Sequence, residues 1–370
     1  MLDFLPEILR TPVAFLVVLG VLVFIHELGH YLAARWMGVH VETFSIGFGR
    51  SIASWRDRAG TEWKLAWIPL GGYVKLHGQE RPEDVGADVR AGWQPGRTFH
   101  EKTVGARSIV IAAGPFANFV LAAVLFILLN AVEGRPVAVP VVGDVLPDSP
   151  AAAAGLRPGD RIEGIGSEKV GRFEDVQRII SRSPGQALEL QVLREGNQVR
   201  LTVTPGERET PNGRVGVLGV RGGKAEFQPM SPIEAVPAGI VQTWDVTVQT
   251  LQGVWGMLST AKGAEDLGGP LRIAQLSGKV AELGLASLIS FIGVLSVNLA
   301  LINLFPIPVL DGGHLVFYLF EAIRGRPLPP RAQEYGFRAG IALLLGLFVF
   351  ATWNDLGHLG LFRWVAGLRG

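Results

Sequence analysis

Cysteine is absent from all 370 residues of the chain, which excludes a disulfide framework and any metal site built from thiolates. Charged residues are scarce too: they make up 18% of the sequence, against about a quarter in a typical soluble domain. The net charge of +1 provides no basic field that attracts nucleic acid, so we expect no nucleic-acid partner. Any bound metal must therefore be held by histidine, aspartate or glutamate.

The chain contains several long apolar runs. Hydrophobic residues make up 48% of the chain, and four stretches are long enough to cross a bilayer, which takes about 20 residues. These stretches are Pro12–Met37, Ala106–Val132, Leu285–Ile307 and Phe337–Trp353. The sequence therefore predicts a multi-pass α-helical membrane protein with about four transmembrane helices in a lipid bilayer.

The first apolar stretch carries the motif His26-Glu27-Leu28-Gly29-His30. On a helix, the pattern H-E-x-x-H puts two imidazoles on one face, where they can bind Zn²⁺ with the glutamate beside the metal as general base. Ionisable residues at membrane depth are costly unless they are paired or functional. An ordinary pair of core histidines does not explain Glu27, so we interpret the motif as part of a zinc site.

A catalytic zinc normally has three protein ligands, so a third is expected at the depth of His30. One span separates the first apolar stretch from the third, so both of their C-terminal ends lie on the same side of the membrane. Asp311 directly follows the third stretch and is the preferred third ligand. Glu133 and Asp355 lie by span ends on the opposite side. His314, one turn past Asp311, is the alternative ligand, or a partner of a ligand.

Two prolines, Pro306 and Pro308, interrupt the end of the third stretch. Broken helical backbone is tolerated at membrane depth where it lines a cavity or is packed in protein; otherwise these prolines mark a helix end at the interface. Asn303, just before them, either donates a hydrogen bond to a developing oxyanion or caps the broken helix.

Between the first two spans, residues 39–74 are rich in glycine, tryptophan and β-forming residues. Phe44–Gly49 and Trp63–Ile68 alternate in the manner of strands, and Gly71–Lys75 is typical of a turn leading into another short strand. The sequence therefore predicts a small sheet that lies against the membrane.

A soluble region of about 150 residues separates the second and third spans. Its first part contains predicted strands at 139–142, 161–165, 187–193 and 198–203 and a predicted helix, Phe173–Ser181. Ser231–Leu258 carries an apolar stripe at helical spacing, which is typical of packing in a core or on a membrane surface.

Together, the H-E-x-x-H motif and the segment Asn303–Gly312 resemble the site-2 protease family of intramembrane zinc metalloproteases, and more closely its bacterial RseP (regulator of sigma-E protease) type. Phe44–Gly49 resembles the family's membrane-associated β region, Gly71–Lys75 its edge strand, and Gly114–Phe119 its second-span motif. The resemblance covers nearly the whole chain. It implies Zn²⁺ as cofactor and a role for each matching residue.

The matching residues are His26, His30 and Asp311 as zinc ligands; Glu27 as catalytic base and Asn303 as a substrate or transition-state contact; and Gly72, Tyr73, Val74 and Lys75 as the substrate-binding strand.

Ser149–Ile162 resembles the S-P-A-x-x-A-G-L-x-x-G-D-x-I signature of bacterial PDZ domains. Many family members have two tandem PDZ domains, whereas this chain has room for one. Such a domain either binds a peptide as an added strand or occludes the membrane opening sterically. Arginines at three span ends weakly favour an orientation with the zinc site on the cytoplasmic side of the membrane. Arginines near both termini favour the opposite orientation. The PDZ domain would then lie on the periplasmic or extracellular side of a bacterial inner membrane.

We therefore expect four parts. Residues 1–134 form the N-terminal half of a membrane protease core, with two spans, the H-E-x-x-H motif and the membrane-associated β region. Residues 135–206 form the inserted PDZ domain, and residues 207–284 a linker with amphipathic membrane-surface helices. Residues 285–370 form the C-terminal half of the core, with two spans and the Asp311 motif.

The resemblance implies regulated intramembrane proteolysis. The implied partners are single-span membrane proteins already cleaved by another protease, of the anti-sigma-factor type, with remnant signal peptides as a further class. Two rival classes are a catalytically inactive membrane scaffold and a transporter with a broken helix. A scaffold does not need Glu27, and a transporter of that kind is expected to show an inverted repeat, which we do not find.

Overall fold

The computed structural model describes residues 6–80, 85–137, 139–210, 213–223, 226–260 and 268–358. Arg363 and Arg369, the arginines near the C-terminus that count against a cytoplasmic zinc face, lie outside the described residues. The chain divides into two compact units, one made of Met1–Leu129 with Val236–Gly370 and the other of Asn130–Ala235. Each unit is described by itself.

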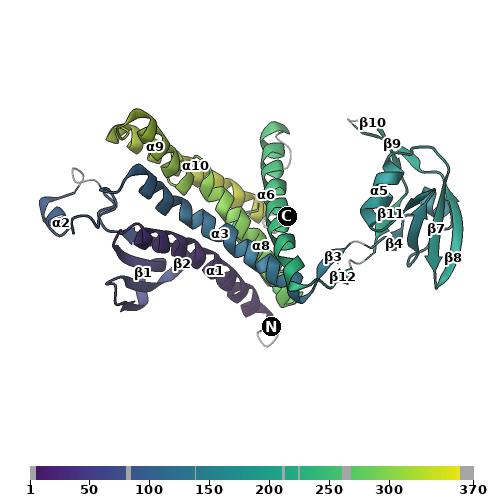
Figure 1. Cartoon of the computed structure of the whole chain (residues 1–370), viewed down its shortest axis with the longest axis horizontal. Helices are drawn as coiled ribbons and strands as arrows, with labels where there is room; N and C mark the ends of the chain where they lie inside the picture. Colours follow the sequence, from purple (N-terminus) through teal and green to yellow (C-terminus); the bar gives the residue numbers. More distant parts are fainter. Residues whose placement is uncertain are drawn as a thin grey trace, which may run out of the picture. The chain divides into compact units, whose positions relative to one another are not determined.

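Within the described residues, four helices of the first unit are long and apolar enough to cross a membrane. They are α1 (Glu7–Trp36), α3 (Val104–Val132), α8 (Leu285–Leu304) and α10 (Pro330–His358) (Figure 1). Each corresponds to one predicted span. The fourth helix starts earlier than predicted because Pro330 occupies its first position, where the fixed φ of proline suits a helix and no N–H is needed.

Strands β1 (Val41–Arg56) and β2 (Glu62–Leu76) form a folded hairpin. Residues 43–46 pair with residues 72–75 on one side and with residues 62–65 on the other. Segment 72–75 has no second strand partner in the described part of the chain, so it forms an edge of this sheet.

Both predicted strands of the β region are found, one in β1 and one in β2. The predicted third strand is not a separate element but the last part of β2. Gly71 turns the chain there with a φ of +126°, a backbone conformation that glycine adopts without a steric penalty. The turn is therefore a bend within one strand.

Helix α1 packs against the sheet with its C-terminal half (Figure 1). Its N-terminal half packs against two helices. Tyr31 and Ala34 are buried with Phe44 of β1, while Val18 and Leu22 are buried with residues of α7 (Pro270–Glu282) and α8. The H-E-x-x-H motif lies between these two packed regions.

Three further helices complete the first unit: α2 (Ala87–Ala91), α9 (Asp311–Arg324) and α6 (Pro232–Thr260), whose first residues belong to the second unit. The apolar stripe predicted in Ser231–Leu258 does lie on a helix. Its large residues are exposed, however, with Trp244 at 66% and Trp255 at 71%. The stripe is thus exposed among the described residues, and its packing on a membrane surface stays a prediction.

The second unit contains a four-stranded sheet in the order β6 (Glu168–Lys169), β5 (Arg161–Ile165), β7 (Leu188–Arg194), β8 (Asn197–Val203). The strands predicted at 161–165, 187–193 and 198–203 are therefore present. So is the predicted helix, as α5 (Phe173–Ser181), whose Val176, Ile179 and Ile180 are buried in the core of this unit. The short helix α4 (Pro150–Ala153) begins where the Ser149 hydroxyl accepts a hydrogen bond from the Ala152 N–H.

The strand predicted at 139–142 is displaced. The structure has β3 (Arg135–Val137) before it and β4 (Val142–Val145) after it. Pro140 lies between them and has no N–H to give to a strand ladder.

The second unit also extends beyond the predicted boundary at residue 206. Strand β11 (Val220–Gly222) pairs with β4, and β12 (Glu226–Gln228) pairs with β3. Strands β9 (Gly206–Thr210) and β10 (Gly213–Val217) pair with each other. The region predicted as a linker from residue 207 thus begins with four strands. Two of them, β11 and β12, pair with strands β4 and β3 at the start of the same unit.

Candidate metal centre

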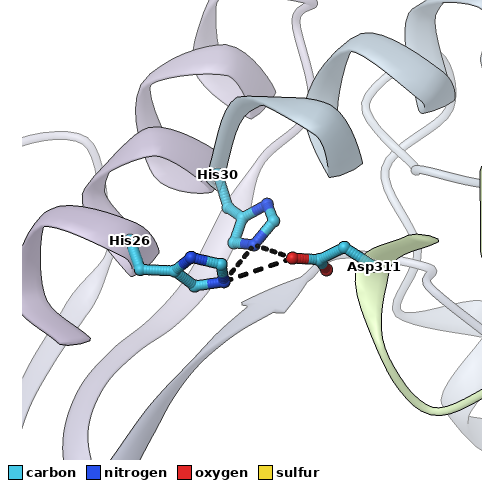
Figure 2. A group of neighbouring side chains, drawn as sticks. All are labelled: His26, His30 and Asp311. Atoms are coloured by element: carbon cyan, nitrogen blue, oxygen red, sulfur yellow. Dashed lines mark hydrogen bonds and ion pairs between the residues drawn. The ribbon is translucent and has the colours of Figure 1, made fainter. Parts of the chain in front are cut away.

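His26 and His30 lie one turn apart on α1, and Asp311 is the first residue of α9. Their side chains point toward one another (Figure 2). The Nε2 atom of His26 lies 3.2 Å from the Asp311 Oδ2 atom and 3.2 Å from the His30 Nε2 atom. The His30 Nε2 atom lies 3.5 Å from the same Asp311 oxygen. Two distant stretches of sequence therefore meet at one point.

The spacing of these three atoms suits one small metal ion. In a tetrahedral zinc site with bonds of about 2.0–2.1 Å, neighbouring ligand atoms lie about 3.4 Å apart. The Asp311 Oδ2 atom is buried and receives no hydrogen bond of good geometry in the described part of the chain. Both imidazoles are buried as well. Two histidines and a carboxylate are also a donor set of catalytic zinc sites, so these residues fit zinc.

A short, tightly packed connection between α8 and α9 places Asp311. This connection contains Pro306 and Pro308. Val309 follows them with a φ of +119°, which is a strained conformation for a β-branched residue. A Cβ atom on Gly312 would overlap the Leu304 carbonyl group, and one on Gly340 of α10 would overlap the Pro308 carbonyl oxygen. Glycine at both positions therefore lets the chain turn sharply beneath α10.

His314, the alternative ligand, lies one turn further along α9. Its ring packs against the Phe337 ring, with 5.4 Å between the centroids. Among the described residues, the group whose ligand atoms lie within 4.8 Å of one another contains Asp311 and not His314. The geometry thus favours the carboxylate as third ligand.

Glu27 lies beside the edge of the sheet. A Cβ atom built on Gly72 would lie 3.0 Å from the Glu27 Cγ atom and 2.7 Å from the Ser45 carbonyl oxygen. The segment predicted to bind substrate therefore begins next to the predicted catalytic base, with no room for a side chain at Gly72.

The other residues of this segment have different environments. Tyr73 stacks on Phe48 with 6.1 Å between ring centroids, and Val74 packs into the cluster around Phe44. Lys75 forms an ion pair with Glu42 at 2.7 Å. That pair and a bond from His77 hold the pKa of Glu42 below its usual value, although burial raises it. Contacts with the sheet thus hold these three side chains in place.

Asn303 lies near the end of α8, and its side-chain amide donates to the Leu299 carbonyl oxygen at 3.0 Å. The structure uses this donor within its own helix rather than at the metal centre. The Asn303 Nδ2 group carries a second N–H, so a contact with an oxyanion does not require it to leave the Leu299 carbonyl oxygen.

Helix α3 contributes to the metal centre in a way that was not predicted from the sequence. The His30 Nδ1 atom lies 2.9 Å from the Val110 carbonyl oxygen, and the His26 Nδ1 atom lies 3.3 Å from the Asn118 Nδ2 atom. Between them, a Cβ atom on Gly114 would overlap the His30 ring. Residues 110, 114 and 118 recur every four positions and so share one helix face. That spacing, within the G-P-x-x-N pattern, was the signal in the sequence.

Comparison with known proteins gives three results. Residues 14–347 match peptidase family M50. A protein of Agrobacterium fabrum that is named as a zinc metalloprotease is 43% identical over 360 residues, which cover 94% of this chain and 96% of the relative. Zinc metalloprotease RasP of Geobacillus kaustophilus is 32% identical over 421 residues, covering 95% of this chain and 98% of that protein.

Among solved structures, the PDZ domain of an SdrC-like protein from Listeria innocua is 17% identical over 25% of this chain and 100% of its own. The TM-score is 0.21. At that value the likeness carries no argument about the fold, so the assignment of residues 135–206 to a PDZ domain stays a prediction.

Proposed function

The chain belongs to peptidase family M50 and is a zinc metalloprotease of the site-2 protease type, and from this premise we propose that it hydrolyses peptide bonds inside the transmembrane segments of other membrane proteins. The observation that carries this proposal is the convergence of His26, His30 and Asp311 on helices packed among candidate membrane spans.

We assign these three residues as the zinc ligands. Bound zinc supplies Lewis-acid chemistry, which activates water for attack and stabilises negative charge on a carbonyl oxygen. The carboxylate of Asp311 supplies one negative charge, and the two imidazoles are held from behind by α3. The ligands are thus oriented by packing between helices rather than by a flexible loop.

Glu27 acts as general base and then as general acid. Its carboxylate takes a proton from the attacking water and returns it to the leaving amine. The position of Glu27 supports this assignment, because it follows a ligand directly in α1 and lies beside Gly72 of the sheet edge.

A transmembrane helix keeps its carbonyl groups in intrahelical hydrogen bonds, so it must be unwound before it is cut. Residues 72–75 provide an edge to which an unwound substrate can add as a strand and recover those bonds. A substrate paired there would pass Glu27. The edge therefore both receives the substrate and brings its backbone to the base.

The substrates in this proposal are single-span membrane proteins that another protease has already shortened, of the anti-sigma-factor type, with remnant signal peptides as a further class. The unit formed by Asn130–Ala235 acts as a filter on the periplasmic or extracellular side of a bacterial inner membrane, by binding a peptide end or by blocking access. The segment Ser149–Ile162, which resembles the PDZ signature, and the edge strands β6 and β8 of the sheet support this role.

Zinc analysis and cleavage of a model single-span substrate by the purified full-length protein test the proposal together. We expect cleavage that stops with a chelator and returns with added zinc. The variant Glu27→Gln should retain zinc and cut nothing, whereas Glu282→Gln, which alters an ion pair with Arg10 at the other end of α1, should cut normally. Cleavage by Glu27→Gln at the normal rate would refute the assignment of the base. Chelator-resistant cleavage would refute the zinc mechanism.

A further inference from the structure

The two imidazoles of the metal centre both direct their Nδ1 atoms at α3, but their partners differ in kind. The partner of His30 is the Val110 carbonyl oxygen, which can only accept a hydrogen bond. The His30 Nδ1 atom must therefore carry the proton, which leaves Nε2 free to bind a metal. The partner of His26 is the side-chain amide of Asn118, which offers both a donor and an acceptor.

The orientation of that amide is coupled to metal binding. With Nδ2 of Asn118 donating to the His26 Nδ1 atom, a neutral imidazole carries its proton on Nε2. That atom faces Asp311 and His30, so this tautomer cannot bind zinc there. Half a turn of the amide exchanges Oδ1 and Nδ2, which have nearly the same shape. In that orientation the Asn118 Oδ1 atom would accept a hydrogen bond from the Nδ1–H of His26, and the His26 Nε2 atom would carry no proton.

Asn118 can make this contact with either atom of its amide, and among the described residues no other partner fixes the orientation. The residue is fully buried, and its Oδ1 atom has no hydrogen-bond partner in the described part of the chain. A buried polar atom without a partner costs free energy. After the exchange, Oδ1 accepts a hydrogen bond from His26 and Nδ2 takes the position without a partner, so the two orientations differ in the tautomer of His26 that they select.

The backbone of Asn118 is held in place from the other side. The Ser296 hydroxyl of α8 donates to the Asn118 carbonyl oxygen at 2.8 Å, and both residues are fully buried. Asn118 therefore lies where α1, α3 and α8 meet. Its side chain is poised to act on His26 from a rigid position.

We propose that Asn118 is a positioning residue of the zinc site. In the zinc-loaded protein its Oδ1 atom accepts a hydrogen bond from the Nδ1–H of His26, which selects the tautomer and fixes the ring orientation that present Nε2 to the metal. The inference rests on the proposed role of His26 as a ligand. Asn118 would thus orient His26 in the same way as the Val110 carbonyl oxygen orients His30.

Zinc affinity of the full-length protein, measured by competition with a chelator of known affinity, tests this role without any assay of activity. Asn118→Leu removes the acceptor at similar volume and is expected to weaken zinc binding about 10- to 100-fold. Asn118→Asp keeps an acceptor and is expected to stay within about threefold of the unmodified protein. If Asn118→Leu fails to fold, Asn118→Ala removes the same acceptor without adding a branched side chain.

Asn298→Leu is the matched control, because it removes another intramembrane amide, which accepts a hydrogen bond from Thr250 at 2.9 Å. We expect it to leave zinc affinity unchanged. Unchanged affinity in Asn118→Leu would overturn the proposal. So would equal weakening in the Leu and Asp variants, since packing alone would then explain both.

His26→Ala separates this inference from the proposed function. If His26→Ala binds zinc as tightly as the unmodified protein, the proposed metal site is wrong. If it loses zinc while Asn118→Leu does not, only the positioning role is wrong. Adding Asn118→Leu to His26→Ala should cause no further loss, because the ring that Asn118 orients is already absent; a further loss would contradict the coupling.

Discussion

Arg107 at the start of α3 and Glu321 on α9 form an ion pair, with 2.7 Å between the Nη2 and Oε1 atoms. Each side chain is only 16% exposed. The same guanidinium lies 4.9 Å from the centre of the Tyr318 ring, a favourable cation–π distance. Since α9 begins with Asp311 and α3 supports both imidazoles, this pair connects the helix of one proposed ligand to the helix that orients the other two.

Glu321→Gln should therefore weaken both the fold and the metal site. The variant leaves a largely buried guanidinium without its counter-ion, which costs about 3 kcal/mol. We expect a lower thermal midpoint and weaker zinc binding. Glu334→Gln is the control, because its pair with Arg338 is 59% and 70% exposed and should contribute less than about 1 kcal/mol. Equal effects of the two substitutions would contradict the proposed link.

The choice between Asp311 and His314 as third ligand can be tested by metal content. Asp311→Ala removes the oxygen that lies 3.2 Å and 3.5 Å from the two imidazoles and should abolish stoichiometric zinc binding. His314→Ala removes a ring that packs on Phe337 and should leave zinc content near normal. Elemental analysis of the purified variants gives the answer. The reverse pattern would assign the ligand to His314.

Gly72→Ala tests the placement of the substrate edge. A methyl group there would lie 2.8 Å from a Val23 methyl and 3.0 Å from the Glu27 side chain, so the edge must move away from the base. Small displacements of reacting groups slow catalysis steeply, and we expect cleavage to fall about 10- to 100-fold with zinc content unchanged.

Gly20→Ala provides the control for that substitution. Gly20 lies on the same helix as Glu27, but a Cβ atom there meets nothing within 4 Å. Cleavage by this variant should be unchanged. Full activity of Gly72→Ala would show that the edge does not hold the substrate near Glu27.

Acid should loosen the second unit through Asp160. This buried carboxylate accepts hydrogen bonds from Arg194 at 2.7 Å and 2.8 Å and from the Arg157 N–H at 2.8 Å. Burial raises the pKa of Asp160, but the bonds from Arg194 and Arg157 outweigh it and hold the pKa below the unfolded value of about 3.9. The resulting stability is fully present above that pH and is lost as the pH falls through the folded pKa.

Hydrogen exchange of the buried strands β5 and β7 in the full-length protein, followed from pH 6 to about pH 3, measures this loss. Asp160→Asn should weaken the unit at neutral pH and remove most of the acid dependence. Glu207→Gln, at an exposed pair with Arg214, should leave the dependence intact. An unchanged acid profile in Asp160→Asn would exclude Asp160 as its source.

Removal of the second unit should relax substrate selection and spare the chemistry. Val137 and Glu226 are directly paired at the end of the β3–β12 ribbon, so an Asn-Gly turn in place of residues 138–225 can close it as a hairpin. We expect the shortened protein to cut a pre-trimmed substrate as before and to begin cutting an untrimmed one. Loss of both activities, with zinc content retained, would contradict a filtering role.

The elements whose sequence signal is local were predicted well. Apolar length alone located the four candidate spans, because a bilayer-spanning helix must be both long and apolar. Helical periodicity alone put His26 and His30 on one face, and the order of the spans brought Asp311 to the same end. The strand predicted at 161–165 was also found where expected.

The features that the sequence did not reveal depend on contacts between residues far apart in the chain. No local pattern shows that residues 43–46 are flanked on both sides: only a family resemblance indicated an edge strand at Gly72, and the structure shows that this edge lies beside Glu27. Nor does one show that Asn118 reaches His26, since that contact exists only when α1 and α3 pack closely. Periodicity in a sequence specifies which face of an element is buried, whereas packing determines what that face touches.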